Sequence, residues 1–209
     1  LCGRITTIEV ADIDSISAVI SWAKGKNENK WNLKVSTTEL ADPSAATADV
    51  FDGALTEQTT ALADLEGNTT YYVYVQSVDE VLECEGQWSN AKTFKTTCKK
   101  QTFPYEEDFE SYETGAGKDM GCMTQCGDDK GAYVTTKTGV TGKRLWLRQV
   151  TKDHNNYFVF PALAIDSVKR LQLSMQVYVG TTATYTYPFE VGVMTDPNDP
   201  STFVATHHE

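Results

Sequence analysis

Hydrophobic and polar residues alternate along most of this chain, and the alternation has a period of two. In the first half, the apolar positions that share one predicted strand face are Ala18, Ile20 and Trp22, then Trp31, Leu33 and Val35, then Tyr71, Val73 and Val75. Successive side chains of a strand point to opposite faces, so this period is typical of strands with one buried face. No stretch of helical length repeats apolar residues at helical spacing, and the pattern predicts an all-β protein.

The second half continues the same alternation. Its apolar positions are Leu145 and Leu147 around Trp146, the run 157–163, the series Leu171, Leu173, Met175, Val177 and Val179, and the series Phe189, Val191 and Val193. A turn signal rich in Asp and Pro follows at 196–200. We expect further sandwich strands here, with Leu145 and Leu147 pointing inward and Trp146 pointing outward.

A short polar stretch at 98–104 separates the two halves and ends in Pro104. Proline has no N–H to donate to a strand ladder, which suits a linker. The 209 residues are enough for two small domains. We therefore expect a first β-sandwich at 1–97, a linker at 98–104 and a second module at 105–209.

Three features of the first half resemble the fibronectin type III domain. They are Trp22, the Trp31-x-Leu33-x-Val35 strand and the run Leu65-Glu66-Gly67-Asn68-Thr69-Thr70-Tyr71-Tyr72-Val73-Tyr74-Val75. The resemblance covers residues 4–97 and implies an immunoglobulin-like sandwich, with Tyr71 as the corner tyrosine whose hydroxyl bonds to upstream backbone. Gly67 departs from the family, which usually has proline at that position.

The aromatic residues of this half each allow two interpretations. Trp22 and Trp31 are in phase with buried aliphatic positions, which favours a core role over a platform for stacking sugars. Tyr72 and Tyr74 point to the other face of the sheet from that core. The two tyrosines are either a binding surface or a cross-strand aromatic pair.

The second half resembles a different module. The motifs that carry this resemblance are Pro104-Tyr105-Glu106-Glu107-Asp108-Phe109-Glu110, Phe160-Pro161-Ala162-Leu163 and Val191-Gly192-Val193-Met194-Thr195-Asp196-Pro197. They resemble the MAM-like jelly-roll modules of bacterial surface proteins, similar to the cleaved-adhesin domains of secreted Bacteroidetes proteins, which commonly alternate with fibronectin type III units. The resemblance covers residues 101–209 and implies a jelly-roll sandwich. Such modules are normally longer, so we expect a fragment of a multi-module protein, or a module completed by another segment.

Five cysteines indicate an oxidising, extracellular setting. In a fibronectin type III sandwich, the chain start and the loop joining the last two strands lie at the same end, so the resemblance implies a disulfide between Cys2 and Cys84. The connectivity of Cys98, Cys122 and Cys126 stays open; a disulfide within this trio leaves one cysteine for another partner. Their spacing lacks the paired CxxC pattern of a zinc site.

The acidic segment contains Asp108 and Glu110, two residues apart. Period two places them on one strand face, where their carboxylates supply the hard oxygen ligands that calcium prefers. The jelly-roll resemblance implies one structural calcium ion, the only cofactor that we expect. A solvated acidic strand explains the same two residues.

Trp146 is the candidate ligand-binding residue because it lies between two leucines that are expected to be buried. An outward tryptophan on a jelly roll can stack on a sugar ring. The alternative is that it packs beneath a loop or against a neighbouring module of the same polypeptide.

Composition excludes several classes of function. The formal charge of -11 and the pI of about 4.7 disfavour nucleic acid as a partner. No apolar run approaches the roughly 18 residues that a membrane span requires. The chain has three histidines and none of the common nucleophile, phosphate-binding or metalloprotease motifs, so we expect no enzyme activity.

The sequence therefore predicts a non-catalytic pair of β-modules from a secreted or surface-anchored bacterial protein. Its partners would be a glycan or a host or cell-surface protein, together with neighbouring modules of the same polypeptide. The alternative is an accessory or spacer segment of a secreted hydrolase whose catalytic domain lies outside these residues.

Overall fold

The computed structural model describes residues 2–25, 28–128, 131–147, 154–167, 171–177 and 189–208. The chain divides into two units, Leu1–Lys99 and Lys100–Glu209. This division falls within the stretch 98–104 that the sequence suggests as a linker. Gln101 nevertheless belongs to the second unit, because it forms a parallel bridge with Leu163.

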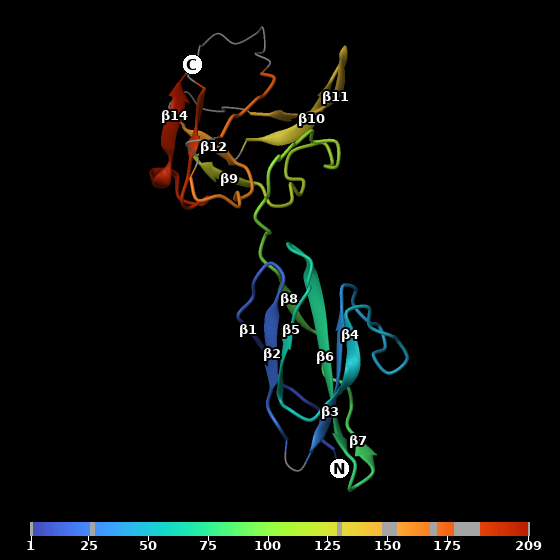
Figure 1. Cartoon of the computed structure of the whole chain (residues 1–209). Coiled ribbons are helices and arrows are strands. Elements are labelled where there is room, and N and C mark those ends of the chain that lie inside the picture. The colour runs from blue at the N-terminus through green and yellow to red at the C-terminus, as the bar shows by residue number, and fades with distance from the viewer. Residues whose placement is uncertain are drawn as a thin grey trace. The chain divides into compact units, whose positions relative to one another are not determined.

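The first unit is a sandwich of two antiparallel sheets (Figure 1). One sheet has the order β1 (Ile8–Ala11), β2 (Ala18–Trp22), β5 (Thr59–Leu62). The other has the order β4 (Phe51–Leu55), β3 (Lys30–Ser36), β6 (Thr70–Asp79), β7 (Cys84–Glu85), with β8 (Lys92–Lys95) also paired to β6. The predicted all-β, immunoglobulin-like sandwich is confirmed for this unit.

The core of the first unit is built from the residues that alternate along its strands. Trp22 of β2 and Trp31 of β3 are buried, and their rings meet edge to face with centroids 6.1 Å apart. Aromatic pairs favour this geometry because the positive ring edge faces the negative ring face. The tryptophans are therefore core residues, and the alternative of a sugar-stacking platform is wrong for them.

Tyr71 forms the corner that the resemblance implies. Its side chain is buried, and its hydroxyl accepts a hydrogen bond from the Glu66 amide (2.7 Å) and donates to the Glu66 carbonyl oxygen (3.4 Å). Its ring stacks on Phe94 of β8 with centroids 5.2 Å apart. A Cβ at Gly67 would lie 3.2 Å from the Lys99 amide nitrogen, which is a steric reason for glycine where the family usually has proline.

Tyr74 differs from its predicted exposure. Its side chain is only 3% exposed, and its hydroxyl accepts a hydrogen bond from the Leu40 amide (2.8 Å). The segment that follows β3 supplies this amide and covers the outward face of β6 at Tyr74. Burial raises the pKa of the Tyr74 hydroxyl above its ordinary value of 10.0. Tyr72 is half-buried.

A disulfide joins Cys2 to Cys84 of β7, with 5.8 Å between the two Cα atoms. The N-terminal segment lies against β6 here, because the Ser77 hydroxyl donates to the Gly3 carbonyl oxygen. Cys98 and Cys122 are also disulfide-bonded, whereas Cys126 keeps a buried thiol.

The strands of the second unit occur as three antiparallel pairs within the described residues. These pairs are β9 (Thr124–Gly127) with β12 (Asn156–Val159), β10 (Tyr133–Lys137) with β11 (Val140–Trp146), and β13 (Glu190–Val193) with β14 (Val204–His208). A 3₁₀ turn, η2 (Pro200–Thr202), follows the predicted Asp-rich and Pro-rich turn. The two-sheet jelly roll stays a prediction for this unit.

A small core supports the second unit. Met120, Met123 and Val134 are buried together, and the side chains that pack against them are Phe109, Tyr112, Leu145 and Phe158. Leu145 points inward as predicted, but Leu147 is 50% exposed because β11 ends at Trp146.

The strand predicted for the series Leu171 to Val177 is wrong. Residues 171–177 have no strand pairing, and Leu173 and Val177 are 63% and 60% exposed. Alternation specifies which side chains share a face, whereas a strand also needs a hydrogen-bonded neighbour. Val179, the last member of the series, lies outside the described residues.

We predict that Tyr71→Phe lowers the free energy of unfolding of the first unit by about 1 kcal/mol, because the part-buried hydrogen bond of the Glu66 amide loses its acceptor. Urea unfolding followed by tryptophan fluorescence measures the effect. Tyr72→Phe is the matched control, since no hydrogen bond of the Tyr72 hydroxyl occurs among the described residues. Equal losses for the two variants would contradict the corner role.

Replacing Cys2 and Cys84 by serine should lower the same free energy by about 2–4 kcal/mol, because the disulfide closes a loop with a sequence separation of 82 and restricts the unfolded chain. Non-reducing peptide mapping of the wild-type protein should recover the Cys2–Cys84 cross-link. A thiol at Cys84 under oxidising conditions would refute the pairing.

Candidate functional site

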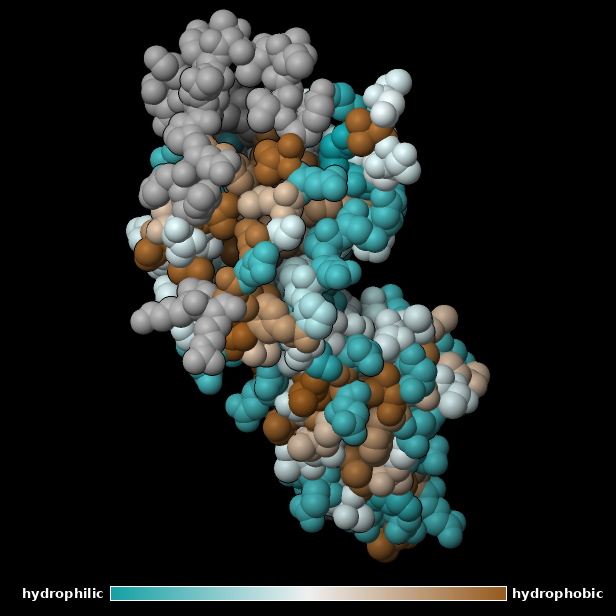
Figure 2. Space-filling view, turned by 45° about the horizontal axis from the view of Figure 1, so that its top comes forward, coloured by the Kyte–Doolittle hydropathy of each residue, from teal (hydrophilic) through white to brown (hydrophobic). Residues whose placement is uncertain are grey.

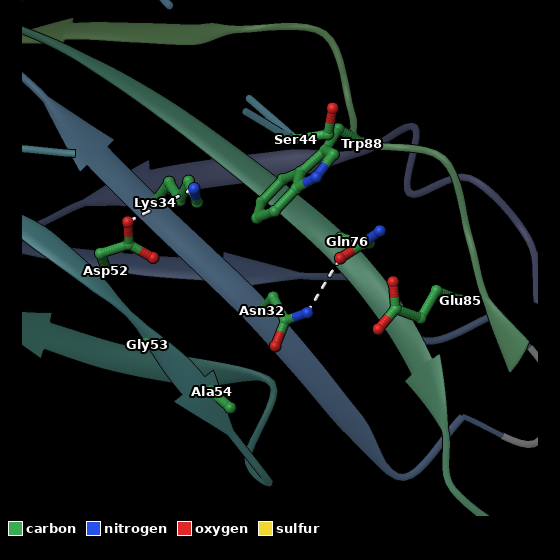
Figure 3. A pocket seen from close by; sticks show the side chains of 9 residues that line it. All are labelled: Asn32, Lys34, Ser44, Asp52, Gly53, Ala54, Gln76, Glu85 and Trp88. Carbon is green, nitrogen blue, oxygen red and sulfur yellow. Dashed lines mark hydrogen bonds and ion pairs between the residues drawn. The ribbon is translucent and has the colours of Figure 1, made fainter. Parts of the chain in front are cut away.

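A polar groove of about 380 Å³ lies on the outer face of the sheet β4-β3-β6-β7. Its lining residues are Asn32, Lys34, Ser44, Asp52, Gly53, Ala54, Gln76, Glu85 and Trp88 (Figure 3). Asn32 and Lys34 alternate along β3 with the buried Trp31, Leu33 and Val35. The alternation that builds the core therefore also turns these polar side chains toward the groove.

Lys34 lines the groove beside Asp52 and is mostly buried, with 12% of its side chain exposed. Its ammonium nitrogen is 3.3 Å from Asp52 Oδ2, donates to the Ala46 carbonyl oxygen, and lies 5.4 Å from the centroid of the Trp88 ring. The ion pair and the cation–π contact reinforce each other because both act on a partly desolvated ammonium. Together they hold the Trp88 ring against the sheet.

Trp88 supplies the aromatic wall of the groove and is half-buried. Its backbone is anchored from the N-terminal segment, because Arg4 Nε donates to the Trp88 carbonyl oxygen (2.8 Å). Arg4 Nη2 also donates to Asn90 Oδ1 (2.6 Å). The two contacts fix the loop that presents the indole.

Two amide side chains connect β3 to β6 beneath the groove. Asn32 Nδ2 donates to Gln76 Oε1 (2.8 Å), and Gln76 Nε2 donates to the Gly86 carbonyl oxygen (3.0 Å). These bonds assign the amide orientations and leave the Asn32 carbonyl oxygen as an acceptor. Asp52 and Glu85 add carboxylate oxygens to the lining, so the groove offers more acceptors than donors.

Small residues keep one end of the groove open. Gly53 and Ala54 of β4 line it beside Asp52. The lining contains one lysine and two acidic residues, and it contains no histidine or cysteine that would act with Ser44 in nucleophilic catalysis. The arrangement suits recognition of a neutral ligand with several hydrogen-bond donors.

The groove cannot be recognised from the sequence pattern. Its strand residues lie on the polar half of the alternation, which also describes an ordinary solvated sheet face. The available signal was Trp88, a tryptophan outside the strand pattern in a polar segment after Gly86. Only the fold brings it next to Lys34, which is 54 positions away in the chain.

Trp146 is 45% exposed at the end of β11, and its strand partner is Tyr133 of β10. The outward orientation that the alternation predicts is thus present. Trp146 lies in the second unit and is not part of the groove.

Asp108 and Glu110 lie in a turn, so the strand face that the sequence suggested for them is wrong. Asp108 Oδ1 accepts from the Glu110 amide (3.0 Å), and the Glu110 carboxylate accepts from the Lys143 amide. Across the described residues, no three His, Cys, Asp or Glu side chains form a cluster suited to a metal ion. Calcium binding by Asp108 and Glu110 stays a prediction.

Glu107 connects two tyrosines of the same segment. Its Oε2 accepts hydrogen bonds from the Tyr105 hydroxyl (3.3 Å) and the Tyr112 hydroxyl (3.2 Å). Burial, followed by the Glu107 charge, raises the pKa of Tyr105 to about 12. Both hydroxyls therefore remain protonated donors at neutral pH, and the cluster is a structural tie.

Ser44 lies in the loop between β3 and β4, and Asp49 holds the two ends of this loop together. Its carboxylate accepts hydrogen bonds from the Thr37 hydroxyl and the Thr37 amide (2.9 Å). The Thr37 hydroxyl, as the largest cause, holds the pKa of Asp49 below its ordinary value of 3.8.

We predict that this closure is pH-dependent. Because the folded pKa is lowered, the stabilisation is present above pH 3.8 and is lost as the pH falls through the folded value. The NMR shift of the Thr37 amide should titrate with a midpoint below 3.8, and Asp49→Asn should abolish the transition. The exposed Glu57→Gln should leave it in place. A midpoint above 3.8 would contradict the assignment.

Within the described ranges, no helix has the length and hydropathy needed to cross a bilayer. A scan against protein-family models and a search of curated proteins gave no match.

Solved structures that match part of the chain include several fibronectin type III domains. The FN1–FN3 domains of chicken CNTN1 are 19% identical over 45% of this chain and 30% of theirs, with a TM-score of 0.36. The FN5 domain of Drosophila Lar is 17% identical over 46% of this chain and 98% of its own, with a TM-score of 0.35. The sixth fibronectin type III domain from human fibronectin type III domain containing protein 3 is 15% identical over 51% and 94%, with a TM-score of 0.38.

Proposed function

We propose that this chain is a non-catalytic binding segment of an extracellular protein, and that the first unit binds a neutral glycan in the polar groove on β3, β4 and β6. The observation that carries the proposal is the half-buried Trp88 ring, fixed by Lys34 beside an acceptor-rich floor. The disulfide between Cys2 and Cys84 supports an oxidising compartment.

The chemistry of the groove favours a polyhydroxyl ligand. The Asn32 carbonyl oxygen and the carboxylates of Asp52 and Glu85 accept hydrogen bonds from hydroxyl groups. The indole gives an apolar surface for the C–H face of a sugar ring, while its neighbours remain polar. The acidic lining disfavours an anionic ligand, because like charges repel at short range.

The finer assignment rests on the two sequence resemblances. They support a secreted or surface-anchored bacterial protein that adheres to a glycan or to a host or cell-surface protein. The second candidate is an accessory or spacer segment of a secreted hydrolase. A catalytic motif in the sequence flanking these residues would favour that candidate.

The test is a neutral-glycan array followed by calorimetry on wild type, Trp88→Ala and Phe103→Ala. We expect Trp88→Ala to weaken binding by about tenfold, since loss of one aromatic contact costs about 1–2 kcal/mol. Phe103→Ala is the control, because it removes an exposed aromatic side chain that belongs to neither proposed site. Circular dichroism verifies that both variants fold.

If Trp88→Ala leaves the glycan affinity unchanged, the groove is not the binding site. Binding to a surface protein without any glycan would favour protein adhesion, and absence of both would favour the spacer.

A further inference from the structure

The hairpin of β10 and β11 has one face turned into the small core of the second unit and one face turned away from it. Val134 and Leu145 are strand partners on the inner face. Tyr133 is paired with Trp146, and Thr135 with Arg144, so these four residues share the outer face. Figure 1 shows the hairpin beside the pair β9 and β12. We call these four residues the hairpin face.

Arg144 has an unusual environment on the hairpin face. Its Nε and Nη2 atoms are almost completely shielded from solvent and have no hydrogen-bond partner among the residues that the structure describes. None of the ion pairs among the described residues includes Arg144. Two of the three guanidinium nitrogens thus lack both water and an acceptor, which is unfavourable because the desolvation of their N–H groups is not compensated.

The two unpaired nitrogens lie on the same edge of the guanidinium. Their N–H groups are parallel and form the fork that accepts both oxygens of a carboxylate. Other nitrogen donors, such as a lysine ammonium, lack this planar match. The unsatisfied edge therefore has the geometry to bind an anion with two coplanar oxygens.

The residues beside Arg144 on the hairpin face indicate which class of ligand would bear the carboxylate. Trp146 is 45% exposed and offers a large flat apolar surface. Tyr133 and Thr135 are half-buried: the Tyr133 hydroxyl can donate or accept, and the Thr135 hydroxyl, which donates to the Thr136 carbonyl oxygen (3.2 Å), can accept. An anion receptor flanked by a stacking ring and hydroxyls fits a sugar acid, which combines a carboxylate with an apolar ring face and several hydroxyls.

We propose that the hairpin face binds a carboxylate-bearing glycan, with Arg144 paired to the carboxylate and Trp146 stacked on the sugar ring. Because Nε and Nη2 are shielded in the unliganded chain, this binding mode requires the partly buried Arg144 side chain to change its rotamer and turn the fork toward the ligand. The site belongs to the second unit, whereas the groove belongs to the first, and its ligand is anionic where the ligand proposed for the groove is neutral.

The net charge of the chain sharpens this inference. At a formal charge of -11, the protein as a whole repels anions. Binding of an acidic glycan must then come from the local fork and ring, not from a general basic surface. We expect the affinity to change little between about 0.05 and 0.3 M salt, since contacts in a partly desolvated site are weakly screened.

The first experiment is an array of uronate, sialate, sulfated and neutral glycans probed with the whole chain. Binding to uronate or sialate glycans that persists in Trp88→Ala supports the hairpin face. Binding to sulfated glycans alone overturns the carboxylate assignment, and absence of acidic ligands overturns the site. Because the neutral-glycan test depends on Trp88, the two proposals fail independently.

The second experiment measures the affinity for the best acidic ligand in Arg144→Gln, Arg144→Lys and Trp146→Ala. Each should lose about tenfold or more, including the lysine variant, because it keeps the charge but loses the fork. Lys100→Gln is the control, since it removes an exposed positive charge elsewhere in the second unit. An equal loss in Lys100→Gln, or full binding by Arg144→Lys, overturns the proposal.

Thermal unfolding separates a loss of ligand binding from a loss of stability. If the Arg144 edge awaits a ligand, Arg144→Met removes two shielded N–H donors that lack an acceptor, and the melting temperature of the unliganded chain should be unchanged or higher. The acidic ligand should raise the melting temperature of wild type but not of Arg144→Met. A lower melting temperature for the unliganded variant overturns the proposal, because Arg144 would then be a structural residue.

Discussion

The edge-to-face contact between Trp22 and Trp31 fixes the first unit, because it joins the two sheets at the centre of the sandwich. Trp31 sets the register of β3, whose inward residues fill the core while Asn32 and Lys34 face outward. A slip of one residue would exchange the two sets and expose the apolar one, which burial strongly disfavours. The polar groove therefore owes its position to the packing of the core on the other side of the same strand.

The two units bury their apolar residues to different extents. The first has a continuous core around the two tryptophans, whereas the described part of the second has a core of three buried residues, Met120, Met123 and Val134. Hydrophobic atoms reach the surface of the second unit on the face drawn in Figure 2. Among the described residues of this unit, Leu173 and Val177 are large hydrophobic side chains with exposed fractions of 63% and 60%. The well-packed unit thus supplies a rigid support for its groove, while the hairpin face depends on a smaller buried cluster.

The groove and the hairpin face use complementary chemistry. In the groove, Lys34 is already paired with Asp52, so the remaining groups are mainly acceptors. On the hairpin face, the Arg144 fork is a donor without an acceptor. A tryptophan accompanies the polar groups in both places, Trp88 in one and Trp146 in the other. The same physical combination of an aromatic surface with directed hydrogen bonds therefore serves ligands of different charge.

The period of two by itself determined the all-β class, the buried tryptophans and the outward direction of Trp146, because side-chain alternation is a local property of a strand. It failed at 171–177, where pairing depends on a neighbouring strand, and at Asp108 and Glu110, where a turn replaces the strand. Only the tertiary structure brought Trp88 to Lys34, because this contact joins segments that are distant in the chain. The tertiary structure also left the Arg144 edge without an acceptor, because no described segment places one beside it.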